Sequence, residues 1–423
     1  MAQPPPHHPP QFQPWYRRIG PSLVTACVVI GPGSIMTSSK IGANERYDLL
    51  WVVLLSALFM LLFMTLGARL GAVADAAPGD LIRRKAGKWL ARLLGLSVLF
   101  ISAAFQSGNN IGVAAALSAY ISSTWVVAGL VILFNALAIS FLYLFKEQYK
   151  MLERVMTAFV AIMLVSFAIN LVQLRPDPLA LARGFVPSWQ NSPDMLSVLG
   201  LVGTTFVIAA AFYQAYLVRQ KGWQVEDLRA GLVDARLGAA VMFLITVMIM
   251  STAAAGLYTG QEVVLADPIA VATALEQTFG PSAKVIFCLG LFSAAYSSFL
   301  INSMVGGFMA ADGLGLGSRP DQGWPRWLTT AVLVIGMLIG IAVLVFDFDR
   351  RPTIIAAQAV TVVVAPLVAG VLLWLTSSRD VMGTHVNSPL IMVLGLVGVV
   401  LLLAMAGKTA VIDLPRQLES YLH

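Results

Sequence analysis

Two short segments inside apolar stretches carry residues suited to binding a small solute. In the first, Gly31-Pro32-Gly33-Ser34 interrupts an apolar stretch near its middle. Proline lacks a backbone N–H and glycine weakens a helix, so we expect a break that exposes carbonyls, amides and a hydroxyl. The second segment, Thr205 to Ala209, contains no proline, so we expect a milder break there. The candidate binding residues are Gly31, Gly33, Ser34, Thr205, Val207 and Ala209.

Three amide side chains elsewhere could complete such a site. Gln106 and Asn109 lie three residues apart and would share a helix face, and Gln358 lies in a later apolar stretch. Amides inside an apolar bundle either line a binding pathway or hydrogen-bond between helices, and the sequence leaves both roles open. Ser34 is also a candidate metal ligand, because its hydroxyl oxygen lies at the break.

Lys40 is a lone cation in the first apolar stretch. It follows Ser34 by six residues, which on a helix places it about 9 Å beyond the break. It could extend to the membrane interface or pair with Glu45. Alternatively, it lines an outer vestibule, where it would repel metal cations and attract anions. The amide-rich N-terminal ends of half-helices at a break also favour anions, so an anionic ligand stays open.

Carboxylates and imidazoles are missing from the central parts of the apolar stretches. The acids lie at their ends, as with Asp48, Glu153, Asp194, Asp312 and Asp347. A proton relay through the centre is therefore not expected. The sequence also contains no GxSxG, HExxH or Walker motif, so we expect no enzyme activity and no cofactor.

The elements that hold these residues must be membrane-spanning helices. The 423 residues are 58% hydrophobic and 11% charged, a composition that a soluble chain of this size could not place on its surface. A spanning helix needs about 20 mostly apolar residues, and such runs recur along the chain. The expected spans are 19–44, 47–73, 90–121, 124–146, 150–174, 195–218, 236–258, 282–311, 326–346, 353–376 and 388–407.

The charge distribution sets the expected topology. The net charge of +6 comes from Lys and Arg in short connections, which indicates orientation in the membrane and not nucleic-acid binding. We expect a cytoplasmic N-terminus, an external C-terminus and two buried free thiols. A disordered cytoplasmic tail is expected at 1–18, and one transmembrane domain at 19–423. That domain divides into repeats at about 19–174 and 195–376 and an extra helix at about 388–407.

Three segments resemble helices of a known family. GPSLVTACVVIGPGSIMTSSKIGA is similar to the first helix of the Nramp (natural resistance-associated macrophage protein) divalent metal transporters, GTTFVIAAAFYQAYLVRQKG to the sixth, and PSAKVIFCLGLFSAAYSSFLINS to the eighth. The resemblance covers nearly the whole chain. It implies an all-α integral membrane protein with the LeuT-type fold, about eleven transmembrane helices, two inverted five-helix repeats and broken helices 1 and 6.

The sequence departs from the family at the residues that bind metal. The family's Asp and Asn in the first break and its Met-Pro-His run in the sixth helix correspond here to Gly31, Ser34, Val207, Ile208 and Ala209. Its acids on the third helix correspond to Gln106 and Asn109, and its second histidine on the sixth helix falls near Gln214. The resemblance therefore implies a divergent branch with a different site and without the family's usual proton coupling.

Two functions remain open. The family favours a transporter that carries a divalent metal ion such as Mn²⁺ or Mg²⁺ by alternating access, with a largely hydrated ion held by neutral oxygens. The alternative is a transporter of a small anion or zwitterionic organic solute bound at the helix 1 and 6 breaks. In either case we expect a multi-pass protein of a bacterial inner membrane, monomeric, in contact with the lipid bilayer and without nucleic acid.

Overall fold

The computed structural model describes residues 20–144, 148–187, 195–265, 267–346, 350–409 and 411. Side chains are described for all of these except 148, 195–197 and 350–362. The tail expected at 1–18 lies outside the described residues, as do Asp194 and Asp347.

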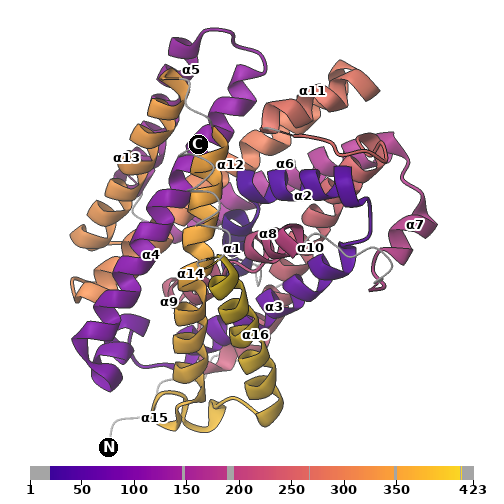
Figure 1. Cartoon of the computed structure of the whole chain (residues 1–423). Helices are drawn as coiled ribbons and strands as arrows, with labels where there is room; N and C mark the ends of the chain where they lie inside the picture. Colours follow the sequence, from indigo (N-terminus) through magenta and orange to yellow (C-terminus); the bar gives the residue numbers. More distant parts are fainter. Residues whose placement is uncertain are drawn as a thin grey trace, which may run out of the picture.

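The described chain folds into helices, as the composition predicts (Figure 1). Nine helices in this part are long and apolar enough to cross a membrane, and two bent helix pairs bring the total to eleven. The expectation of about eleven spans is therefore confirmed. The main helices are α1 (Pro21–Val29), α2 (Pro32–Glu45), α3 (Leu50–Val73), α4 (Pro78–Ser118), α5 (Thr124–Leu144), α6 (Gln148–Leu174), α8 (Met195–Thr205), α9 (Ile208–Lys221), α10 (Leu228–Gly256), α12 (Pro281–Leu314), α13 (Gly323–Val345), α14 (Arg350–Ser377) and α16 (Pro389–Lys408). Shorter helices are α7 (Pro178–Arg183), α11 (Pro268–Phe279) and α15 (Arg379–Met382).

The starts of two expected spans are wrong. The third was expected at residue 90, but α4 begins at Pro78 because a basic helical segment precedes the apolar stretch and buries Leu81 and Ile82. Gly87, with φ of 86°, kinks the helix between the two parts. The seventh was expected at residue 236, but α10 begins at Leu228, which places Asp234 inside the helix.

The first span is broken as its sequence predicts. Helix α1 ends at Val29, α2 begins at Pro32, and the two are bent by 60°. Pro32 suits the first position of a helix, where its missing N–H costs nothing. The sixth span is interrupted only at 206–207, between α8 and α9, and otherwise runs as one span. The milder second break is consistent with the absence of proline there.

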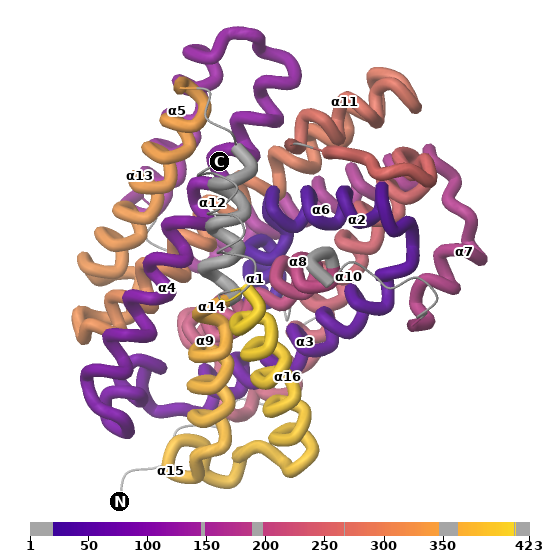
Figure 2. Tube along the Cα trace, in the orientation of Figure 1, coloured from indigo at the N-terminus to yellow at the C-terminus, as the bar shows by residue number. Residues whose placement is uncertain are grey.

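Both broken spans lie inside the bundle, and close packing holds them there (Figure 2). Helix α1 packs against α6, α9, α10 and α12, and α2 packs against α8 and α10. Glycines permit the closest approaches. A Cβ on Gly112 of α4 would lie 2.2 Å from Pro32 Cγ, and one on Gly42 of α2 would lie 2.2 Å from the Met250 carbonyl of α10.

Candidate functional site

The break in the first span leaves a backbone carbonyl without its usual helical donor. In a continuous helix the Val28 carbonyl would accept from the N–H four residues on, but that residue is Pro32, which has none. The last turn of α1 is instead closed by the Ile30 N–H, which donates to the Ala26 carbonyl at 3.0 Å. The Val28 carbonyl, at the negative end of the α1 dipole, is thus available to a cation.

Three oxygens converge beside Gly31. A Cβ at this glycine would lie 3.5 Å from Asn109 Oδ1, 3.6 Å from Ser298 Oγ and 3.9 Å from the Val28 carbonyl oxygen. We call this space the Gly31 recess. Asn109 comes from α4 and Ser298 from α12, and both are buried. The recess therefore joins an amide, a hydroxyl and a main-chain oxygen from three helices, all uncharged.

Several polar atoms near the breaks are buried without a hydrogen-bond partner. They are Ser298 Oγ, Ser34 Oγ, Thr205 Oγ1 and Gln106 Nε2. Most buried polar groups in proteins are hydrogen-bonded, because an unpaired one costs about 1–3 kcal/mol. The three hydroxyl oxygens are free to contact a bound ion, its water shell or another polar solute, whereas Gln106 Nε2 can only donate a hydrogen bond.

The amides on α4 have different roles. Asn109 Nδ2 donates to Gln106 Oε1 at 3.1 Å, so these two form a pair whose Asn109 end faces the Gly31 recess. Asn110 instead accepts from Asn135 of α5 at 2.7 Å. Asn110 thus forms an interhelical hydrogen bond, whereas Asn109 lines the recess.

The remaining predicted site residues lie at the second break, on α2 and on α14. Thr205, Val207 and Ala209 are buried at the second break, whose halves pack against α2 and α1. Gly33 is half-buried, next to Ser34. Gln358 lies on α14, but its side chain is outside the described part. Lys40 is exposed on α2, beyond the break.

A buried carboxylate that the sequence reading missed lies at the start of α1. Asp234 of α10 is 0% exposed and accepts from the Gly20 N–H at 2.8 Å and the Ser22 N–H at 3.0 Å. Gln214 joins it through Ser22. Asp234 was missed because residues 228–235 were assigned to a loop. Its spacing of four residues from Gly238, on the small-residue face of α10, was the available signal.

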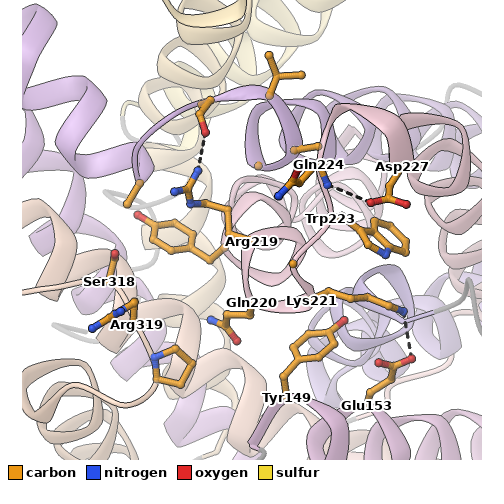
Figure 3. Close-up of a pocket in the computed structure, with 18 of the residues that line it drawn as sticks. Tyr149, Glu153, Arg219, Gln220, Lys221, Trp223, Gln224, Asp227, Ser318 and Arg319 are labelled. Carbon is orange, nitrogen blue, oxygen red and sulfur yellow. Dashed lines mark hydrogen bonds and ion pairs between the residues drawn. The ribbon is translucent and has the colours of Figure 1, made fainter. Parts of the chain in front are cut away.

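An open cavity of 2390 Å³ lies near Gly20, where α1 begins, since Lys221 and Glu153 both line it and lie beside Gly20. Figure 3 shows side chains that line the cavity. Seven Lys or Arg side chains line it together with six Asp or Glu side chains, and we call this end the basic face. Lys221 pairs with Glu153 there at 3.3 Å, and Arg219 donates to the Ala74 carbonyl at 2.7 Å. Arg84 hydrogen-bonds to Asp75 and holds the pKa of this exposed carboxyl below its usual value. The described residues that line the cavity include none from α1.

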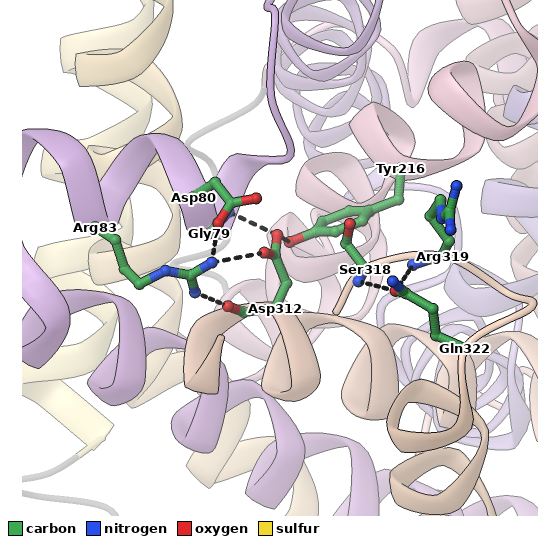
Figure 4. Close-up of polar contacts among 8 residues, drawn as sticks. All are labelled: Gly79, Asp80, Arg83, Tyr216, Asp312, Ser318, Arg319 and Gln322. Atoms are coloured by element: carbon green, nitrogen blue, oxygen red, sulfur yellow. Dashed lines mark hydrogen bonds and ion pairs between the residues drawn. The ribbon is translucent and has the colours of Figure 1, made fainter. Parts of the chain in front are cut away.

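A second buried carboxylate stands near the same face (Figure 4). Asp312 of α12 accepts from the Gly79 N–H and from the Tyr216 hydroxyl, both at 2.7 Å. Arg83 lies 3.7 Å from its other oxygen. Asp312 therefore caps α4 and fixes it to α9 and α12. Asp312 lies near the end of its span, as predicted, but its burial was not predicted.

Among the residues described, no three His, Cys, Asp or Glu side chains form a group that could hold a metal ion. The oxygens that the structure places beside Gly31, from Val28, Asn109 and Ser298, are all uncharged. The arrangement can dehydrate a small ion in part, because carbonyl, amide and hydroxyl oxygens are ligands that hard cations accept.

Known proteins resemble this chain along most of its length. A divalent metal cation transporter, MntH, of Deinococcus radiodurans is 27% identical over 402 residues, covering 92% of this chain and 88% of the relative. A metal transporter, an nramp1 homolog, of Dictyostelium discoideum is 26% identical over 387 residues, covering 88% and 70%. A crystal structure of the Eremococcus coleocola manganese transporter superposes with a TM-score of 0.81 at 17% identity, covering 95% of this chain and 87% of that one.

The superposition confirms the expected LeuT-type fold. The breaks in the first and sixth spans are those between α1 and α2 and between α8 and α9. The sequence also matches the family described as natural resistance-associated macrophage protein-like over residues 22–411. The chain is a multi-pass membrane transporter that belongs to the Nramp family.

Proposed function

We propose that this protein transports a divalent metal ion by alternating access, with the ion bound at the helix 1 and 6 breaks. Relatives named as divalent metal cation transporters match about nine tenths of the chain, which supports the substrate class. The observation that carries the proposal is the Gly31 recess, where three oxygens converge at the position of the family's aspartate.

The ligand oxygens at the Gly31 recess favour a hard ion. Oxygen ligands suit Mg²⁺ and Mn²⁺, whereas softer ions prefer sulfur or nitrogen. None of the three oxygens described at the recess belongs to a carboxylate, so we expect the ion to keep several of its waters, as Mg²⁺ commonly does in proteins. The unpartnered hydroxyls of Ser34 and Thr205 can accept hydrogen bonds from the waters of such a shell, whereas the unpartnered Gln106 Nε2 can only donate.

A small anion or zwitterion is the second candidate. Its support is Lys40 together with the N-terminal amides of α2 and α9 at the breaks. Lys40, however, is exposed beyond the break, and Pro32 removes one of the amides that α2 could offer. The carbonyl end of α1 also opposes an anion.

The orientation of the protein in the membrane and the coupling of transport are part of the proposal. We propose that the basic face is cytoplasmic, because positive residues concentrate on that side of membrane proteins. The same proposal includes two repeats, at about 19–174 and 195–376. It also includes a bacterial inner-membrane location, a monomeric state and transport without the family's usual proton coupling.

The test is calorimetric titration of the purified protein with Mn²⁺ and Mg²⁺, together with uptake of both ions into proteoliposomes. We expect saturable binding and uptake that Ser298→Ala weakens and the exposed Lys40→Ala leaves unchanged. Silence in both assays at millimolar metal refutes metal transport. Loss of solute uptake in Lys40→Ala would then support the anion.

A further inference from the structure

The inner half of the first span is held by a carboxylate from another helix. Asp234 of α10 accepts three short hydrogen bonds from the first turn of α1. The donors are the Gly20 N–H at 2.8 Å, the Ser22 N–H at 3.0 Å and the Ser22 hydroxyl at 2.7 Å. Gly20 has no side chain with which to cap α1 itself. Asp234 therefore supplies the negative cap that the start of this helix requires.

The same contact includes the inner half of the sixth span. Gln214 of α9 donates to Ser22 Oγ at 2.9 Å and lies 3.5 Å from Asp234 Oδ2. Its carbonyl accepts from the Thr25 hydroxyl on α1. Gly238 brings α10 close, since a Cβ there would lie 2.5 Å from Ser22 Cβ. Helix α1 is thus fixed to both α9 and α10.

Release of α1 would act directly on the binding site. Helix α1 has nine residues and is separated from α2 by the 60° break, so it can move as a unit. Its last turn carries the Val28 carbonyl, one of the three oxygens of the Gly31 recess. A shift of α1 away from α9 and α10 would remove that oxygen and open a path toward the basic face.

We propose that Asp234 is a positioning residue for transport, whose carboxylate holds α1 closed over the inner side of the site until the ion is released. The inference rests on the proposed alternating access, but it concerns a residue that touches no substrate. It explains why a carboxylate is buried here, although the centre of the spans has none. A carboxylate offers acceptors on both oxygens, and each of its hydrogen-bond partners here is a donor.

The native Cys27 provides a reporter of α1 movement. It lies on α1, is 0% exposed, and its sulfur lies 3.8 Å from the Met156 carbonyl of α6. The only other cysteine, Cys288, can be removed as Cys288→Ala. In that background we would measure the rate at which a maleimide labels Cys27, in detergent and without added metal.

Asp234→Asn should raise the labelling rate at least about tenfold. The amide keeps one acceptor but points an N–H at a donor, so hydrogen bonds to a charged group are lost. The matched control is Asp312→Asn. It removes a similarly buried carboxylate of α12, which caps α4 and not α1. Asp312→Asn should lower the thermal stability, yet Cys27 should be labelled as slowly as in the Cys288→Ala parent protein.

Equal labelling of Asp234→Asn and the parent would overturn the proposal. Equally fast labelling in both aspartate variants would also do so, because it would mean general loosening. If Asp234→Asn does not fold, Gly238→Ala decides the question by pushing on Ser22 while keeping the carboxylate. It must accelerate labelling, whereas Gly129→Ala, with nothing within 4 Å, must not. Because no metal is present, failure of the proposed substrate would not affect this result.

Discussion

Substituting Gly31 by alanine tests the candidate site with little disturbance of the fold. The added Cβ would make only ordinary contacts, at 3.5 to 3.9 Å, with the three oxygens of the Gly31 recess. The backbone φ of −112° is one that alanine adopts freely. We therefore expect the free energy of unfolding to change by less than about 1 kcal/mol.

The effect on binding should be much larger. A hard ion needs oxygens at about 2.0–2.6 Å, and a methyl group among the three oxygens leaves no room for that geometry. If two of the three contacts are lost, at about 1.5–3 kcal/mol each, the total is about 3–6 kcal/mol. Because about 1.4 kcal/mol is a factor of ten, affinity should fall at least about 100-fold.

The assay is metal titration and proteoliposome uptake, with thermal unfolding as the measure of folding. The matched control is Gly108→Ala on α4, one residue from Asn109, where a Cβ meets nothing within 4 Å. Gly108→Ala should transport normally. Unchanged metal affinity in folded Gly31→Ala would refute the assignment of the Gly31 recess as the site.

Three further outcomes are expected. Gly42→Ala places a Cβ 2.2 Å from the Met250 carbonyl, so overpacking should lower stability by about 1–3 kcal/mol, measured by thermal unfolding. Val207→Met adds a thioether at the second break and should raise affinity for Cd²⁺ relative to Mg²⁺ in competition titrations. Asn44→Ala removes hydrogen bonds to the Val263 N–H (2.7 Å) and carbonyl (3.0 Å), so hydrogen exchange should accelerate around Val263; unchanged exchange would contradict this.

The elements that local chemistry dictates were predictable from the sequence. Apolar runs of spanning length identified the helices, and Pro32 with its flanking glycines located the first break. The starts of α4 and α10 were not predictable from hydropathy, because their first turns are basic or mixed and become helical only by packing. Hydropathy and composition therefore predict where the spans lie but not where the helices begin.

The site was only partly predictable, because its oxygens come from distant segments. Asn109 was named from its spacing, and the structure places it against Gly31. The hydrogen bond between Asp234 and Ser22 joins residues 212 positions apart in the sequence, so no local pattern predicts it. Tertiary packing, and not sequence spacing, brings such groups together.

The three oxygens that the structure describes at the Gly31 recess are uncharged, and this determines how the membrane voltage acts on transport. Because no anionic ligand there moves with the ion to cancel its charge, each divalent cation should cross the membrane as two net charges. An inside-negative potential of 100 mV would then contribute about 4.6 kcal/mol per ion. That is enough to sustain an accumulation of about three orders of magnitude without a second ion gradient. The electrical potential alone could therefore energise uptake.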